Sequence, residues 1–140
     1  MSLEQAAQIE QPHFSPAGPA ARLSPALIHG QPVWVQCPVW CVADHVAENE
    51  GFLEDVAHSG AMVDLVVPGG EPSYRLLVHA RLGSDPFGPR PEERGPFVVI
   101  DDGSEGHHLS AVEAEEFAVR LVAFAEQVRA RARLISGSAA

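Results

Sequence analysis

The chain has no lysine, and all nine of its basic residues are arginine. Its 19 acidic residues leave a formal net charge of −10 at pH 7. An acidic surface opposes general binding to nucleic acid or anionic membranes, because both need a basic field. Only the segment with Arg129, Arg131 and Arg133 is basic, so zinc-dependent nucleic-acid binding stays a disfavoured alternative. The absence of lysine, together with abundant Ala, Gly, Pro and Val, is also typical of a protein from a high-GC genome.

Long apolar runs are absent too. No stretch of 18 apolar residues occurs, so no transmembrane helix is expected. The N-terminus lacks the basic start and apolar core of a signal peptide, which favours a cytoplasmic location. In a reducing compartment, two neighbouring cysteines are more often metal ligands or redox groups than a structural disulfide.

Cysteine is scarce, and the only two lie close together. Cys37 and Cys41 are followed by His45 and His58, which gives the spacing C-x3-C-x3-H-x12-H. Two thiolates and two imidazoles form a complete tetrahedral shell for Zn2+. A filled shell leaves no position for a substrate, so the pattern predicts one structural zinc ion per chain.

Other interpretations of these residues stay open. Cys37 and Cys41 are also compatible with two reduced, buried thiols beside surface histidines, or with a reversible disulfide. Asp44 and Asp55 are candidates to orient a ligand imidazole, although each is also explained as a solvated acidic side chain. Trp40 is a candidate shield for the metal or a plain core aromatic.

The segment around the cysteines predicts a strand followed by a helix. Residues 32–36 alternate as in a β-strand. Pro38 is favoured at the first helical position, which makes Cys37 an N-cap and predicts a helix over 38–47. Cys37, Cys41 and His45 would then lie near one face of this helix.

Further strands are expected over 61–67, 74–82 and 97–101. The first two read as an antiparallel hairpin, and the third as a central strand. The loop 83–96 is long for a small domain, which indicates mobility or function. His79 and the pair His107-His108 are interpreted as surface or connecting residues rather than ligands.

A long helix is expected at the C-terminal end. Ser110 and Glu113 form a capping box, and acidic residues lie early and arginines late in the helix. Its apolar residues step by four, three and four positions, which predicts one stripe that packs across the sheet. The stripe consists of Phe117, Leu121, Phe124 and Val128.

The sequence thus predicts an α+β domain: an N-terminal zinc knuckle, a small antiparallel sheet of three to four strands, and one long C-terminal helix packed on the sheet. Residues 31–135 are expected to form this single domain. Residues 1–30 and 136–140 are expected to be disordered tails.

Several of these segments together resemble a known family. They are Cys37-Pro38-Val39-Trp40-Cys41 with Asp44-His45, then Glu54–His58, and the helix 109–118. They resemble a family of small uncharacterised actinobacterial proteins with a C-P-x-W-C…H…H signature, over about residues 32–128. The resemblance implies the same four-residue metal grouping and no established activity.

The function favoured by this pattern is a non-enzymatic, zinc-stabilised interaction or regulatory module. Its expected partner is another protein or a second copy in a homodimer. An enzyme that uses an openable metal site or a Cys37 thiolate is the alternative. Signatures of zinc deaminases, serine hydrolases, P-loops and dinucleotide sites are absent from the sequence.

Overall fold

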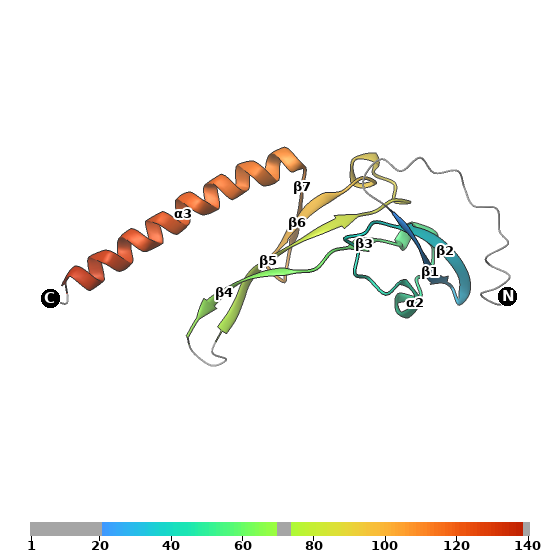
Figure 1. The fold of residues 1–140 in the computed structure, drawn as a ribbon, viewed down its shortest axis with the longest axis horizontal. Helices are drawn as coiled ribbons and strands as arrows, with labels where there is room; N and C mark the ends of the chain where they lie inside the picture. Colours follow the sequence, from blue (N-terminus) through green and yellow to red (C-terminus); the bar gives the residue numbers. More distant parts are fainter. Residues whose placement is uncertain (1–20, 70–73, 139–140) are drawn as a thin grey trace. The chain divides into compact units, whose positions relative to one another are not determined.

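The computed structural model describes residues 21–69 and 74–138. The chain divides into two units, one up to residue 108 and one from residue 109 onward. The first unit holds two antiparallel sheets and the second a long helix, which confirms the predicted α+β class (Figure 1). In chain order the elements are β1 (Arg22–Ile28), β2 (Gln31–Cys37), α2 (His45–Glu48), η1 (Leu53–Asp55), β3 (His58–Ser59), β4 (Val63–Pro68), β5 (Tyr74–Ser84), η2 (Pro91–Glu93), β6 (Phe97–Asp101), β7 (Gly106–Leu109) and α3 (Ala111–Ser138).

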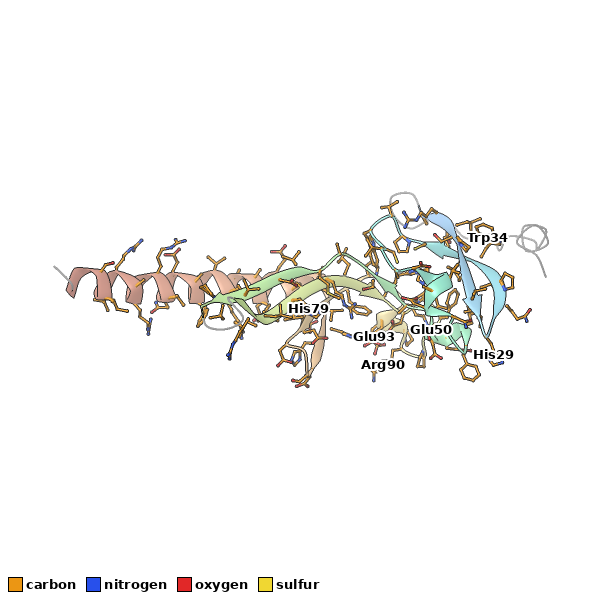
Figure 2. All side chains as sticks on the ribbon, turned by 90° about the horizontal axis from the view of Figure 1, so that it is seen from below. His29, Trp34, Glu50, His79, Arg90 and Glu93 are labelled. Carbon is orange, nitrogen blue, oxygen red and sulfur yellow. The ribbon has the colours of Figure 1, made fainter. Side chains whose placement is uncertain are left out.

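Strands β1 and β2 form a hairpin that begins inside the predicted N-terminal tail. Residues 29–30 form its two-residue turn, and both have positive φ, +48° for His29 and +74° for Gly30. Such a turn matches the right-handed twist of the paired strands. The His29 N–H donates to the Glu50 carbonyl at 2.7 Å, and these two residues lie together in Figure 2. The prediction of a tail over 1–30 is therefore wrong for residues 22–28, while residues 1–20 lie outside the described ones.

The larger sheet has five strands in the described part of the chain, more than the three to four predicted. Its order is β3-β5-β6-β7, and β4 pairs with β5 beyond the short β3. The expected antiparallel β4–β5 pairing and the central place of β6 are both confirmed. His107 and His108 lie in strand β7 rather than in the loop that the sequence predicted.

The buried apolar core of the first unit is small. Ala26 of β1, Val35 of β2 and Val56 form its one cluster of buried hydrophobic residues in the described chain. In the larger sheet, Phe97 packs directly over Gly83 on the neighbouring strand. Few large side chains are therefore available to hold the two sheets together by apolar burial alone.

Helix α3 has the predicted start. The Ser110 N–H donates to Glu113 Oε2 at 2.8 Å and the Glu113 N–H to Ser110 Oγ at 3.3 Å, which confirms the capping box. The helix continues to Ser138, so the predicted tail over 136–140 is wrong for its first three residues. The packing of this helix on the sheet stays a prediction. Among the described residues, no helix has the length and apolar character needed to cross a membrane.

A candidate metal centre

Cys37 and Cys41 lie at the two ends of a tight turn. Cys37 is the last residue of β2, and the Cys41 N–H donates to the Pro38 carbonyl at 3.0 Å. The helix predicted over 38–47 is therefore wrong for residues 38–44. The turn is held from outside, because Cys41 bridges to Gly60 and its carbonyl accepts from Arg22 Nη2 at 2.9 Å. These contacts to distant strands override the local helix signal of Pro38.

His45 opens the short helix α2. Asp44 is the N-cap, and its carboxylate accepts from the N–H groups of Val46 and Ala47. The His45 Nδ1 atom lies 3.0 Å from Glu48 Oε2, so Glu48 fixes the ring and leaves Nε2 directed at the cysteines. A carboxylate on the second nitrogen is the usual arrangement for a metal-binding histidine.

His58 comes from the larger sheet. It lies in β3, where it pairs with Ser84 of β5, and it is only 3% exposed. A hydrogen bond to the Gln36 backbone holds its ring. Trp40 packs edge-on against His58, with ring centroids 6.4 Å apart at 90°, as expected of an aromatic that shields the site from water.

The structure brings the four predicted ligands together. All four are buried, and one ligand atom from each lies within 4.8 Å of the others. Cys37 Sγ lies 3.8 Å from His45 Nε2 and 3.7 Å from His58 Nδ1, and Cys41 Sγ lies 3.7 Å from His45 Nε2. In a tetrahedral zinc site, a sulfur and a nitrogen ligand are separated by roughly 3.6 Å, given the usual bond lengths. These three separations agree with that value, so the cluster is consistent with a tetrahedral metal site.

The protonation of two of these groups is set by their burial. Burial, followed by the neighbouring Cys41 sulfur, raises the pKa of the Cys37 thiol from 9.0 to about 11. Burial and the adjacent His45 lower the pKa of His58 from 6.5 to about 4. Near neutral pH the metal-free site thus holds a neutral imidazole and a protonated thiol. A metal ion that binds there must displace the thiol proton.

The centre joins the two sheets of the first unit. Cys37 belongs to the β1–β2 sheet, whereas His58 belongs to the five-stranded sheet. Beside it, the Val42 N–H donates to the Ser59 carbonyl at 2.8 Å. A metal ion bound here would be coordinated by Cys37 from one sheet and by His58 from the other. It would therefore link the two sheets close to the small apolar core.

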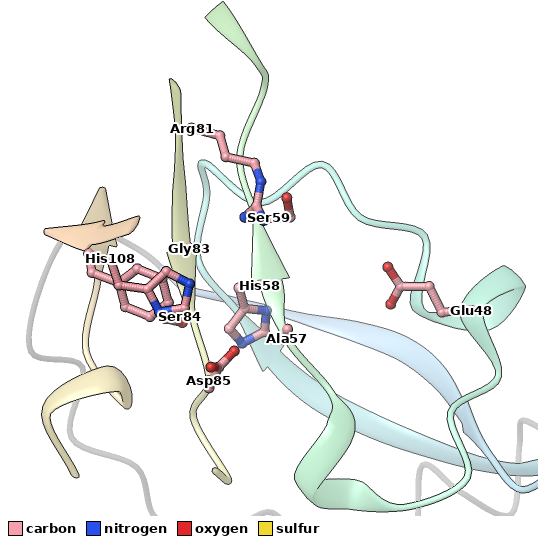
Figure 3. A pocket seen from close by; sticks show the side chains of 10 residues that line it. Glu48, Ala57, His58, Ser59, Arg81, Gly83, Ser84, Asp85 and His108 are labelled. Atoms are coloured by element: carbon pink, nitrogen blue, oxygen red, sulfur yellow. The ribbon is translucent and has the colours of Figure 1, made fainter. Parts of the chain in front are cut away.

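A cavity of about 270 Å³ lies next to His58. In Figure 3, Asp85 and Ser84 lie beside His58, Arg81 extends toward Ser59, and Glu48 faces them across the cavity. Burial and the charge of Glu93 raise the pKa of Asp85. His58 is the one predicted metal ligand that also lines this cavity.

Other candidates from the sequence lie elsewhere. Asp44 supports the site by capping α2, while Asp55 lies exposed in η1 without a described contact to a ligand. His79 pairs with Asp64 and Asp101 across the sheet (Figure 2). His108 stacks on Phe97, with ring centroids 4.4 Å apart, and contacts Glu93.

Glu48 is the functional residue that the sequence analysis did not identify. Its signal was present, because a glutamate three positions after a ligand histidine meets it on the same side of a helix. The predicted helix ended one residue earlier, at residue 47, so Glu48 lay just outside it.

The fold and the cluster define a small α+β domain with a buried Cys2His2 candidate metal centre. The chain belongs to the DUF6907 family, described as a domain of unknown function, whose model matches residues 21–136. No curated protein and no solved structure matches the chain. The family match agrees with the expected resemblance to an uncharacterised family. The actinobacterial origin and the signature itself stay predictions.

Proposed function

We propose that the protein is a non-enzymatic interaction module whose first unit is held together by one structural zinc ion. Cys37, Cys41, His45 and His58 are the proposed ligands. The observation that carries the proposal is the burial of all four side chains with their ligand atoms within 4.8 Å of one another. Zinc is favoured because mixed sulfur and nitrogen donors in tetrahedral geometry suit it best.

The role proposed for the metal is to replace apolar core. The first unit has one small cluster of buried apolar residues in its described part, and the candidate centre lies where its two sheets meet. A filled four-ligand shell contributes folding free energy and offers no position to a substrate. A partner would then bind at the protein surface and not at the metal ion.

The test is the metal content and thermal melting of the untagged full chain, purified without added metal or chelator. We expect about one zinc per chain, and we expect Cys41→Ala and His58→Ala to lose it and to melt at a much lower temperature. His58→Cys should retain zinc, because three cysteines and one histidine also form a structural site. His107→Ala is the matched control, since His107 is exposed on β7.

Well-folded protein without metal would overturn the proposal. Cys37 and Cys41 would then become candidates for a thiol-based activity. Zinc that survives His58→Ala would also contradict the proposed ligand set, whereas loss of zinc in His107→Ala would show that the assay reports general damage.

A second candidate function, an enzyme, is favoured by one observation. His58 contacts both the proposed metal centre and the adjacent cavity, where Asp85 holds its proton to higher pH than usual. Cobalt-loaded protein distinguishes the two, because its visible spectrum reports coordination geometry. A tetrahedral spectrum that added azide leaves unchanged supports the structural site. A spectrum that azide alters would favour the enzyme.

A further inference from the structure

Helix α3 makes up nearly all of the described second unit, and that unit leaves an apolar face of the helix uncovered. It runs 28 residues, from Ala111 to Ser138. Three residues of its stripe are substantially exposed: Leu121 at 38%, Phe124 at 64% and Val128 at 51%. Helices in proteins gain most of their stability from packing such a face against a partner. The stripe therefore requires an occupant.

The charges along α3 indicate which partner suits this apolar stripe. Its first turns carry Glu113, Glu115 and Glu116, and its last turns carry Arg129, Arg131 and Arg133. The helix is thus acidic at one end and basic at the other, so it is complementary to itself when reversed. We propose that α3 pairs antiparallel with α3 of a second copy of this chain, in a two-fold symmetric dimer.

One register satisfies both the apolar stripe and the charges. With the two-fold axis near residue 122, Phe117 of one copy faces Val128 of the other, and Leu121 faces Phe124. At about 100° per residue, Glu113 and Arg131 lie at the same angle beside the stripe. The reversed pairing brings them next to each other across the dimer. The overlap is about 24 residues, or ~36 Å of helix.

A parallel pairing is opposed by the same residues. It would place Glu113 at the level of Glu113 and Arg131 at the level of Arg131, so no Glu–Arg contact would form and charges of one sign would gather at each end of the pair. Glu113 also caps its own helix through one carboxylate oxygen, which leaves the other oxygen for an arginine across the interface. Arg131 lies exposed on the helix, where its guanidinium contacts Gln127.

This inference rests on the proposed interaction function and names its partner. The test is sedimentation of the zinc-replete full chain over a range of concentrations. We expect a dimer, and we expect Leu121→Glu to give a monomer that has lost part of the α3 helix signal in circular dichroism but keeps the zinc content of the native chain. Zinc is measured on the same samples. Dimer without zinc therefore overturns only the proposed metal centre, and zinc in a monomer overturns only the dimer.

A charge exchange tests the antiparallel orientation. Glu113→Arg and Arg131→Glu should each weaken the dimer about tenfold at low salt, because each creates two like-charge contacts. An equimolar mixture of the two variants should recover native affinity, since every contact across the mixed dimer becomes attractive. Recovery on mixing also excludes loss of the Ser110 cap as the cause. Glu115→Arg, on the opposite face, is the matched control.

Three results would overturn the proposal. A monomer at the highest soluble concentration, with α3 amides protected from exchange, would show that α3 packs within its own chain. Single charge variants with native dimer affinity would indicate a parallel pair. Equal weakening by Glu115→Arg would indicate a general charge effect in place of the proposed register.

Discussion

His45 is held at both of its ring nitrogens, and this determines how it can act. Its Nε2 faces the two sulfur atoms, and its Nδ1 contacts Glu48. The carboxylate fixes the tautomer that leaves Nε2 free to bind a metal, and it makes that nitrogen a stronger donor. Glu48 would thus raise the affinity of the candidate site for a metal ion without touching that ion.

Replacement of Glu48 by alanine should lower zinc affinity by about 10- to 100-fold while the four ligands remain. Glu48→Gln should have a smaller effect, because the amide oxygen still accepts the hydrogen bond without a charge. Competition with a chromophoric chelator measures the change. Glu54→Ala is the control, since Glu54 is exposed on η1. Equal affinity of Glu48→Ala and the native protein would remove Glu48 from the site.

Much of the candidate site could be predicted from the sequence at the level of single residues. Cysteine and histidine are the side chains that zinc prefers, so Cys37, Cys41, His45 and His58 stood out by type and spacing alone. The spacing of Glu48 from His45 indicates their contact only if both residues lie in one helix, and the Gln36 backbone has no sequence signal. Their contacts depend on where α2 begins and on how β2 meets β3, which spacing does not encode.

Two elements differ from the sequence prediction, for physical reasons. Strand β1 was missed because Ala, Pro and Ser are weak strand formers. Within it, Pro25 opposes Trp34 in a sheet that has only two strands, where a proline is tolerated at an edge. A turn replaces the helix expected over 38–47 because the distant residues Arg22 and Gly60 fix the backbone at Cys41.

Gly83 is the described glycine of the larger sheet with the least room for a side chain. A Cβ there would lie 2.8 Å from Phe97 Cε2 and 3.2 Å from Val99 Cγ2. Gly83→Ala should therefore destabilise the first unit by roughly 1–3 kcal/mol through overpacking. Urea unfolding measures this, with Gly95→Ala as the control because a Cβ at Gly95 meets no atom within 4 Å. Equal stability of the two variants would show that Phe97 moves away freely.

For the molecule as a whole, the candidate centre makes stability depend on pH. The pKa of His58 is about 4 in the metal-free fold, whereas its ordinary value of 6.5 applies to the unfolded chain. Between these values the unfolded chain binds more protons. The stability from neutral His58 is thus complete above pH 6.5 and is lost as the pH falls through 4. For Cys37, the raised pKa of about 11 gives stability that is complete below pH 9.0 and is lost as the pH rises through 11.

Chelator-treated protein should therefore be most stable between about pH 6.5 and 9. Urea unfolding at low temperature across the pH range measures this. His58→Gln should flatten the acid side of the profile and leave the alkaline side in place. Stability that stays constant from pH 4 to 6.5 in the native sequence would contradict burial of a neutral His58.

The four ligands also lie close together along the chain, with three, three and twelve residues between them. Loop-closure entropy grows with the logarithm of loop length, so these short loops lose little chain freedom when a metal gathers their ends. Each doubling of a loop would add only about 0.6 kcal/mol, and here no loop is long. Because clips that close long loops restrict the unfolded chain most, a metal ion here would stabilise the fold mainly through its bonds in the folded state and only slightly by restricting the unfolded chain.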